Sequence, residues 1–481
     1  MSDLFERIYE SRGVTVESLT PQKVDYQWDE MAELVNVIKY QLLDETQRIG
    51  VLYDPDVDGL MSGYILQDFL TRLNINSYRH MNQNKIHGLK DEAMEWVRRE
   101  QLTTLFIVDA GSGDADNINE LIREGVKVIV LDHHDYEQQP ILDGGYIINA
   151  VNHLPVKETS GCGVVYRFLE YLGQEYDIET NKYEKYVGIT ILSDICSMRN
   201  ADNRYFVEKA YEAVGTGHLF KAFDFYGSFS SYFSYKLIPF FNAMIRCNYI
   251  DGVLSLTDYF EKRGLQTRIA EYQFVRDEQK ERVEKLKEVG EFIELDGLVF
   301  LIRPPQEQNY KVFNGLVANQ LIQQYEMGAI VAEYNPLTNT LEGSFRGYGY
   351  GKDVLEQWGI TCQGHDEACG VSIPMDRMED ILLNFSQEIT RKIKVDFITT
   401  SNGLTEEEWM DLAWFNELYG KDLPLVLVQF EDEPVRVVKY MKKKDMFFRG
   451  VKVVDFGRDI TEGKNIVQPL LNQSSYQLIR R

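Results

Sequence analysis

The chain has 481 residues, and its 44% hydrophobic and 26% charged content is typical of a folded globular protein with a hydrophobic core. This length predicts about three domains. No run of about eighteen apolar residues occurs, and the amino-terminal residues lack a signal segment, so we expect a cytoplasmic protein without a membrane span. The five cysteines form no C-x-x-C pair, which argues against a zinc knuckle and a disulfide framework.

The formal net charge of −25 is unfavourable for binding long nucleic acid. Phosphate backbones attract cationic surfaces, and proteins that hold long strands usually carry a basic stripe. The acidity therefore indicates either an ordinary solvated surface or a substrate so short that only the site itself must hold it.

The first part of the chain reads as alternating strands and helices. Residues 1 to about 45 predict an amphipathic helix with an irregular lead-in. Strands are then expected at 49–53, 104–108, 126–131 and 146–149, and helices at 59–73, 115–124 and 161–172. This alternation predicts an α/β fold, in which a parallel sheet carries helices on both faces.

Three of these strands run directly into acidic residues. The first is followed by Asp54, Asp56, Asp58 and Gly59, the second by Asp109, and the third by Asp132-His133-His134-Asp135. Because an open α/β sheet places its sites at the carboxyl ends of its strands, we expect these side chains to converge. Asp194, after the apolar stretch 187–192, is a fourth candidate.

The candidate ligands combine carboxylates with an imidazole and include no thiolate. They are Asp54, Asp56, Asp58, Asp109, His133 and Asp194. Closely spaced carboxylates at the end of a buried strand repel one another, and bound divalent cations relieve that repulsion. The ligand set suits manganese or magnesium better than a structural zinc.

Two other kinds of site begin in a similar way. The D-x-D-x-D-G pattern opens an EF-hand calcium loop, but Ile65 stands where that loop needs a bidentate Glu, and the preceding segment is strand-like. A D-x-D turn that forms an aspartyl-phosphate also follows a strand. That turn leaves Asp132-His133-His134 unexplained.

The middle of the chain predicts helices followed by a second α/β domain. Residues 206–260 are rich in Phe and Tyr, and we expect packed helices there rather than a base-stacking face. Residues 266–289 are highly charged and contain neither Gly nor Pro, which predicts one long exposed helix. From Glu291 onward, strands are expected at 298–302, 329–333 and 341–346, with a helix at 314–325.

A basic segment near the carboxyl end interrupts the acidic trend. It contains Arg436, Lys439, Lys442, Lys443, Lys444, Arg449 and Lys452, interleaved with Tyr440, Phe447 and Phe448. Cations mixed with stacking rings favour single-stranded nucleic acid. An edge hairpin protected by lysines has the same composition, so both interpretations stay open.

The motifs together resemble a known family. Asp54-Pro-Asp56-Val-Asp58-Gly59, Val108-Asp109-Ala-Gly111, Asp132-His133-His134 and Ser193-Asp194 resemble, in order and approximate spacing, the four motifs of the DHH phosphoesterases. The first motif begins with Asp, as in the RecJ nucleases, and not with His, as in the oligonucleotide and cyclic-dinucleotide phosphodiesterases. Further segments similar to RecJ are Ser160-Gly161-Cys162-Gly163, Pro239 to Arg246 with Asn242, Gly343-Ser344-Phe345-Arg346 and Gly364-His365.

The resemblance covers about residues 45–375 and implies a domain order. It implies a DHH catalytic domain at 1–205, a helical region with a long connecting helix at 206–290, a smaller α/β DHH-associated substrate-binding domain at 291–398, and a small β-rich extension at 399–481. The extension is a candidate for a reduced nucleic-acid-binding module.

The resemblance also implies roles for individual residues. Two divalent cations, Mn²⁺ or alternatively Mg²⁺, would be bridged by Asp109 and held by the ligand set above. His134 would face the scissile phosphate, and Asp132 would orient an imidazole. The substrate would be bound by Ser344, Arg346, Gly364, His365, Asn242 and Arg246.

Departures from the family pattern concern substrate handling more than metal chemistry. Cys362 and Gln363 stand where further glycines are usual before the histidine, and Phe240 stands where an Arg is expected. The segment 78–89, which would hold an Arg and a Gly-Tyr-Gly in the RecJ pattern, contains His80-Met-Asn-Gln-Asn-Lys-Ile-His87-Gly instead. Its His80 and His87 lie close to the equivalent of a substrate-facing loop, and a structural role and a role toward the substrate both stay open for them.

Three functions follow from the resemblance. The first is a 5′-to-3′ exonuclease that removes mononucleotides from single-stranded DNA, with possible partners among replication, recombination and repair proteins. The second is a phosphodiesterase for short oligonucleotides or cyclic dinucleotides, which the acidic charge favours. The third is a non-catalytic subunit of a replication or repair assembly. An inorganic pyrophosphatase of the same family would need a different second domain.

Overall fold

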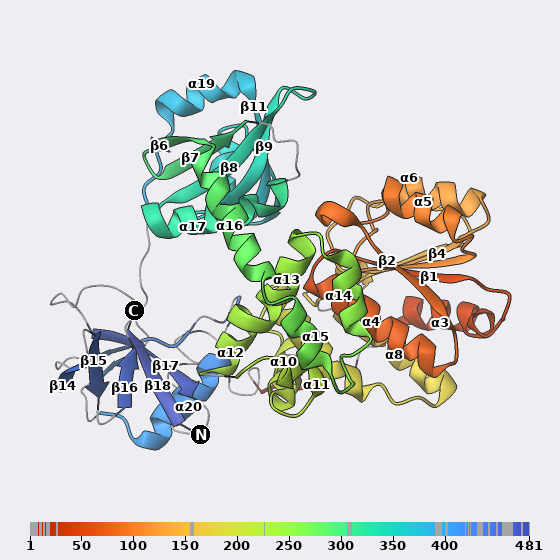
Figure 1. Ribbon diagram of the computed structural model, residues 1–481, viewed down its shortest axis with the longest axis horizontal. Coiled ribbons are helices and arrows are strands. Elements are labelled where there is room, and N and C mark those ends of the chain that lie inside the picture. The colour runs from red at the N-terminus through yellow and green to blue at the C-terminus, as the bar shows by residue number, and fades with distance from the viewer. Residues whose placement is uncertain are drawn as a thin grey trace. The chain divides into compact units, whose positions relative to one another are not determined.

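The computed structural model (Figure 1) divides into two compact units. It describes residues 8, 12, 15, 20–25, 27–153, 158–225, 227–304, 310–389, 397–399, 403–418, 420–421, 423, 425–430, 436–440, 443–448, 451–454, 465–472 and 475–480. Unit 1 comprises Met1–Ile245, Tyr249–Glu271 and Lys394–Arg481, and unit 2 comprises Arg246–Asn248 and Tyr272–Ile393. The four-part domain division expected from the sequence stays a prediction.

Unit 1 is built on a five-stranded, fully parallel sheet in the order β2-β1-β3-β4-β5. Its strands are β1 (Ile49–Tyr53), β2 (Ser77–Met81), β3 (Thr104–Val108), β4 (Lys127–Asp132) and β5 (Gly145–Asn149). The register pairs Tyr53 with Val108 and Val108 with Leu131. The residues that follow β1, β3 and β4 therefore leave the sheet at one edge.

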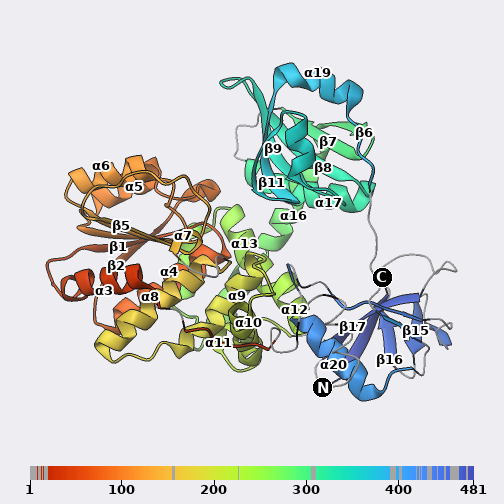
Figure 2. The same cartoon turned by 180° about the vertical axis from the view of Figure 1, so that it is seen from behind.

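Helices cover both faces of this sheet, as Figures 1 and 2 show. α5 and α6 pack on one face through buried residues such as Trp96 and Ile118, and α3, α4 and α8 lie on the other. Their bounds are α3 Asp29–Leu42, α4 Val57–Arg72, α5 Asp91–Arg99, α6 Ala115–Arg123 and α8 Gly161–Tyr176. The predicted α/β class with a parallel sheet is confirmed.

The sequence did not predict β2 and α5. β2 lies at the edge of the sheet, and most of its residues are only partly buried, so the Ser-Tyr-Arg-His-Met sequence contains no apolar run. α5 is amphipathic but has a strongly polar outer face. Both elements are stabilised by packing on the sheet rather than by a local pattern.

A bundle of helices completes the middle of the chain. It contains α7 (Ala150–His153), α9 (Glu184–Ser193), α10 (Ala201–Ala213), α11 (His218–Lys221), α12 (Phe229–Tyr232), a π-helical turn (Phe233–Leu237), α13 (Ile238–Arg246), α14 (Ile250–Thr257) and α15 (Leu265–Glu271). Short 3-10 turns lie at Gln83–Lys85 and Asn181–Tyr183. The aromatic residues pack against one another, as expected; the rings of Phe241 and Phe260 are 5.6 Å apart.

The apolar stretch before Asp194 belongs to a helix and not to a strand. Residues 187–192 lie within α9, and Asp194 is its C-cap. The stretch is buried almost all round, between α4, α8 and α10, which is why it lacks polar positions at helical spacing.

Unit 2 is a six-stranded mixed sheet in the order β10-β11-β9-β8-β7-β6. Its elements are α16 (Val275–Glu288), β6 (Glu291–Leu295), β7 (Leu298–Arg303), a 3-10 turn (Tyr310–Phe313), α17 (Asn314–Tyr325), β8 (Gly328–Asn335), β9 (Thr340–Arg346), α18 (Lys352–Gln357), β10 (Thr361–His365), β11 (Ala368–Pro374) and α19 (Met375–Asn384). A core that includes Phe300, Leu355 and Ile381 joins the sheet to α18 and α19, and α17 packs on β8 and β9. The expected second α/β domain is present.

The expected long helix over 266–289 is wrong in one respect, because it is two helices. α15 ends at Glu271, and α16 begins at Val275 after a turn in which the N–H of Val275 bonds the carbonyl of Tyr272 at 3.1 Å. Ile269 is buried in unit 1, whereas Val283 and Leu286 are buried in unit 2. The apolar residues of 266–289 thus pack into two different cores. No Gly or Pro marks the point between α15 and α16 where the helix is interrupted.

The carboxyl-terminal part of unit 1 is β-rich, as expected. Its seven-stranded sheet has the order β12-β13-β17-β18-β16-β15-β14, and α20 (Glu406–Glu417) packs against β17 and β18. The strands are β12 Phe397–Thr399, β13 Val428–Phe430, β14 Arg436–Tyr440, β15 Lys443–Phe448, β16 Val451–Val454, β17 Asn465–Asn472 and β18 Ser475–Arg480.

Glu417 at the end of α20 joins this sheet to the helical bundle. Its carboxylate accepts a hydrogen bond from the N–H of Ser230 at 2.8 Å, and its carbonyl accepts one from the Tyr211 hydroxyl at 2.7 Å. The side chains of the basic segment 436–452 lie outside the described ones, so its contact with nucleic acid stays a prediction. Among the described residues, no helix has the length and apolar character needed to cross a bilayer.

Gly188 allows α9 to pack closely on α10, and its replacement tests this packing. A Cβ at position 188 would lie 2.0 Å from the carbonyl oxygen of Phe206. We expect Gly188→Ala to lower the free energy of unfolding by about 1–3 kcal/mol through overpacking. Helix propensity alone would raise it by about 1 kcal/mol. An unchanged or higher thermal midpoint, measured by circular dichroism, would contradict the tight crossing.

Candidate metal centre

Asp54 and Asp56 lie in the turn that joins β1 to α4. The Asp56 side chain caps α4 by accepting a hydrogen bond from the backbone N–H of Gly59 at 3.1 Å. A Cβ at position 59 would lie 2.3 Å from the backbone oxygen of Asp54, so this turn requires glycine. The turn therefore fixes two carboxylates at the carboxyl end of β1.

Asp58 lies in the first turn of α4 and is fully buried. Its carboxylate accepts hydrogen bonds from the backbone N–H groups of Gly161 at 2.6 Å and Cys162 at 2.8 Å, which are the first residues of α8. The N-terminus of a helix stabilises negative charge. α8 thus holds Asp58 in place and offsets part of its charge.

Asp109 follows β3 in an unusual backbone conformation. Its φ of 63° lies in the left-handed region, which costs a residue other than glycine about 1–3 kcal/mol. Its carboxylate is buried against the backbone of Gly161, where a Cβ would lie 2.2 Å from Oδ1 of Asp109. The strain and the close approach both serve to aim this carboxylate into the site.

β4 brings Asp132, His133 and His134 to the same edge. The buried Asp132 carboxylate accepts hydrogen bonds from the N–H groups of His133 at 2.7 Å and Ser112 at 3.1 Å. It also lies 2.9 Å from Nδ1 of His134. This contact fixes the orientation of the His134 ring, as expected of a carboxylate behind an imidazole.

Four of the sequence-predicted ligands converge. Asp58, Asp109, His133 and Asp194 each offer a ligand atom within 4.8 Å of the others. Nε2 of His133 lies 3.2 Å from Oδ1 of Asp109 and 3.3 Å from Oδ2 of Asp194. His134 forms a second group of this kind with Asp109 and His133.

Asp54 and Asp56 form another group with a residue that the sequence did not reveal. His87 offers a ligand atom within 4.8 Å of atoms from both aspartates, and its Nδ1 is 2.5 Å from Oδ2 of Asp54. His87 follows the 3-10 turn after β2 and lacks any motif of its own. The aspartates after β1 imply a positively charged or metal-binding partner for Asp54, but nothing in the sequence identifies His87 as that partner.

The charges in this cluster are poorly balanced. Burial raises the pKa of Asp109 well above its usual range, and the neighbouring Asp58 raises it further. Burial opposes a charge on the His133 imidazole, but Asp194 outweighs this effect and raises the pKa of His133 to about 10. Burial likewise opposes a charge on His134, yet Asp132 raises its pKa to about 9. Added positive charge would stabilise the ionised carboxylates.

The residues present fit a divalent cation. Three buried atoms of the cluster make no hydrogen bond within the described part of the chain, namely Oδ1 of Asp54, Oδ1 of Asp109 and Nε2 of His133. Buried polar atoms are seldom left without partners, and here all three belong to candidate ligands, Asp109 and His133 in one group and Asp54 in the other. Carboxylate oxygens and an imidazole without a thiolate suit Mn²⁺ or Mg²⁺.

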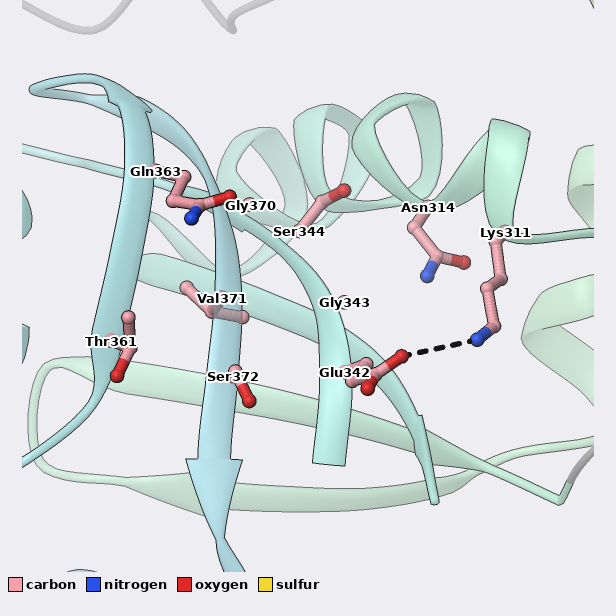
Figure 3. Close-up of a pocket in the computed structure, with 10 residues that line it drawn as sticks. All are labelled: Lys311, Asn314, Glu342, Gly343, Ser344, Thr361, Gln363, Gly370, Val371 and Ser372. Atoms are coloured by element: carbon pink, nitrogen blue, oxygen red, sulfur yellow. Dashed lines mark hydrogen bonds and ion pairs between the residues drawn. The ribbon is translucent and has the colours of Figure 1, made fainter. Parts of the chain in front are cut away.

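The residues expected to bind substrate are distributed over both units. Ser344 lines a pocket of about 410 Å³ in unit 2 (Figure 3), and Arg346 lies on the same strand, β9. Gly364, on β10, has a φ of 122°, and the His365 side chain lies outside the described ones. Asn242 and Arg246 lie one turn apart on α13. The roles of these residues stay predictions.

Replacing Gly161 tests the contact between α8 and Asp109. A methyl group at this position would displace the Asp109 carboxylate, so we expect Gly161→Ala to weaken Mn²⁺ binding by about 10–100-fold, as loss of ligand support typically does. Titration calorimetry of chelator-treated protein would measure this. Gly113→Ala is the matched control, because no atom of the described residues lies within 4 Å of its Cβ position. Equal affinities for the two variants would contradict the packing described.

Known proteins resemble this chain in both sequence and structure. Residues 48–193 match the DHH family, N-terminal domain. The SPbeta prophage-derived protein YorK of Bacillus subtilis strain 168, a candidate single-strand DNA-specific exonuclease, is 24% identical over 464 residues, which cover 84% of this chain and 78% of YorK.

Two solved structures of RecJ from Thermus thermophilus share the fold. The Mn²⁺ complex has a TM-score of 0.76 at 20% identity and covers 98% of this chain and 74% of that chain. The Mg²⁺ complex has a TM-score of 0.70 at 18% identity and covers 98% and 73%. The chain as a whole therefore has the RecJ fold, and its residues 48–193 match the DHH family, N-terminal domain.

Proposed function

We propose that this protein hydrolyses phosphodiester bonds with divalent cations, as a RecJ-like exonuclease that releases mononucleotides from single-stranded DNA in the 5′-to-3′ direction. The observation that carries the proposal is the convergence of Asp58, Asp109, His133 and Asp194 within 4.8 Å, with buried ligand atoms that lack hydrogen bonds within the described part of the chain. The name of YorK, a candidate single-strand DNA-specific exonuclease, supports the substrate, and the polarity rests on the resemblance of the motifs to RecJ. A role in recombination or repair, in the cytoplasm, is part of the proposal.

The proposed ligands divide between the two groups of side chains. Two cations, Mn²⁺ or alternatively Mg²⁺, would supply a deprotonated water and neutralise charge on the phosphate oxygens. Asp109 would bridge them. Asp58, His133 and Asp194 would be the further ligands of one cation. Asp54 and Asp56 would be those of the other.

His134 would act on the substrate rather than as a ligand alone. The Asp132 carboxylate at 2.9 Å raises the pKa of His134, so its imidazole carries a proton near neutral pH. A protonated ring held in one orientation can donate a hydrogen bond to a phosphate oxygen. Ser344, Arg346, Gly364, His365, Asn242 and Arg246 are proposed to hold the remainder of the strand.

A phosphodiesterase for short oligonucleotides or cyclic dinucleotides is the second candidate, and the net charge of −25 favours it. A non-catalytic subunit is disfavoured, since all six expected ligands are present and four of them share one cluster.

A digestion series would test the function and separate these candidates. Single-stranded DNA of several lengths, labelled at the 5′ or the 3′ end, would be incubated with Mn²⁺, Mg²⁺ or chelator, beside a dinucleotide and a cyclic dinucleotide. We expect immediate release of the 5′ label from long strands and none with chelator. Activity on dinucleotides alone would support the second candidate, and binding without any cleavage would support the subunit.

Asp109→Asn is the negative control for that series. Asn tolerates the left-handed conformation at this position, so the fold should persist while hydrolysis falls at least about 100-fold. Asp116→Asn, in the exposed first turn of α6, changes the charge equally and should leave activity intact.

His87 allows the number of cations to be tested. We propose that it serves the group formed with Asp54 and Asp56, so His87→Ala should lower the Mn²⁺ stoichiometry from two ions to one. Metal analysis after gel filtration would count the ions. His80→Ala is the control, because this second histidine of the segment stacks on Trp96. Equal stoichiometry in wild type and His87→Ala would remove His87 from the site.

A further inference from the structure

A buried charge, Arg303, lies behind the wall of the pocket in unit 2, where it contacts the lining residue Asn314. No part of the Arg303 side chain, at the end of β7, is exposed. Its Nε and Nη1 have no hydrogen-bond partner among the described residues, and the nearest carboxylate oxygen of Glu333 is 4.0 Å away. Burial lowers the pKa of Arg303 because this carboxylate offsets the desolvation only in part. A buried guanidinium with unused donors is costly unless it serves a purpose.

Arg303 is hydrogen-bonded to Asn314, which lines the pocket. Nη2 of Arg303 donates to Oδ1 of Asn314. Because a guanidinium can only donate, this bond fixes the orientation of the Asn314 amide. The oxygen faces Arg303, and the NH₂ group is left to donate elsewhere. Figure 3 shows Asn314 and Lys311 on the same side of the pocket.

Three further sources of positive charge lie at the same place. Asn314 begins α17, a helix of 12 residues, so the positive end of the helix dipole is here. The Arg346 guanidinium lies against it, since a Cβ at Gly315 would be 2.4 Å from Nη2 of Arg346. Lys311 adds an ammonium group at the pocket wall.

Lys311 pairs with both carboxylates near this part of the pocket and offsets part of their negative charge. Glu342 also lines the pocket, but the carboxylate is 3.3 Å from Nζ of Lys311 and accepts a hydrogen bond from Asn335 at 2.8 Å. Glu333 is likewise 3.2 Å from Nζ of Lys311. Arg303 and Arg346 have no carboxylate within ordinary ion-pair distance among the described residues other than Glu333 at 4.0 Å. The end of the pocket at Asn314 is therefore the cationic one.

We propose that the end of the pocket at Asn314 binds a phosphate group of the nucleic-acid strand, with Asn314 as a binding residue and buried Arg303 as the positioning residue that turns its amide donor outward. The identity of the strand rests on the proposed function; the phosphate site itself does not. Helix N-termini with oriented donors and nearby arginines are the arrangement that binds phosphate.

Binding without hydrolysis would test this site separately from the metal centre. Deoxyadenosine 5′-monophosphate and deoxyadenosine would be titrated into the full chain by calorimetry in the presence of chelator. We expect the monophosphate to bind wild type at least about 10-fold more tightly than the nucleoside. Equal binding of the two would overturn the proposal, whether or not the protein cleaves DNA.

Asn314→Asp removes the donor while keeping the shape. The new carboxylate can pair with Arg303, so the thermal midpoint should not fall. Affinity for the monophosphate should fall at least about 10-fold, because the amide donor is replaced by a negative charge. Asn319→Asp, on the exposed face of the same helix, adds the same charge and should change affinity less than about twofold, as a screened surface charge would. If Asn314→Asp lowers the affinity for the monophosphate by less than about 10-fold, Asn314 is not a binding residue.

Arg303 is tested by comparing a similar and a dissimilar replacement. Arg303→Lys keeps a donor for Asn314 and should retain binding within about threefold. Arg303→Met fills the space without a donor and should lose binding at least about 10-fold, with circular dichroism showing that the fold is retained. Equal affinities for these two variants would show that Arg303 has a structural role only.

If Asn314→Asp fails to fold, Gly370→Val provides the second test. Gly370 lines the same pocket, and the nearest described atom to its Cβ position is 3.7 Å away, so valine fits on β11 and occupies the cavity. It should lower affinity for the monophosphate at least about 10-fold without lowering the thermal midpoint. Unchanged affinity would exclude this pocket as the phosphate site.

Discussion

The structure of unit 1 depends on holding several buried carboxylates close together. Asp54, Asp58 and Asp109 are all almost fully buried at one sheet edge, where their repulsion is not screened by water. The fold counters this repulsion with the N-terminus of α8, which donates two backbone hydrogen bonds to Asp58, and with His133 between Asp109 and Asp194. These contacts offset only part of the charge, and a bound cation would offset the remainder.

Close packing around the carboxylates follows from the same constraint. Gly59 and Gly161 have no side chain where one would collide with Asp54 or Asp109. Asp109 itself is held at a φ of 63°, which the buried β3 can impose because the strand is paired on both sides. The site is therefore rigid because the sheet, the β1–α4 turn and α8 meet at one point, and α9 contributes Asp194 through its packing on α10.

The sequence predicted those parts of the site that follow from strand register. Asp54, Asp109 and Asp132 each come directly after or at the end of a buried apolar strand, so a parallel sheet was enough to bring them together. His87 could not be predicted, because it lies 33 residues from Asp54 in a loop after the polar edge strand β2. The break between α15 and α16 was equally hidden, because it depends on two separate cores and not on a local signal.

The acidic net charge does not prevent this protein from binding an anionic strand, because positive charge acts locally. At physiological salt, exposed charges more than about 8 Å apart are largely screened, whereas buried charges are not. The Arg303 side chain is fully buried and Arg346 is half-buried, and both guanidinium groups lie next to the N-terminal residues of α17. Such a site attracts a phosphate that has entered the pocket, but it does not attract a strand from a distance. A strand held through this pocket alone should therefore bind with a weak dependence on strand length, since that part of the affinity comes from a few buried contacts.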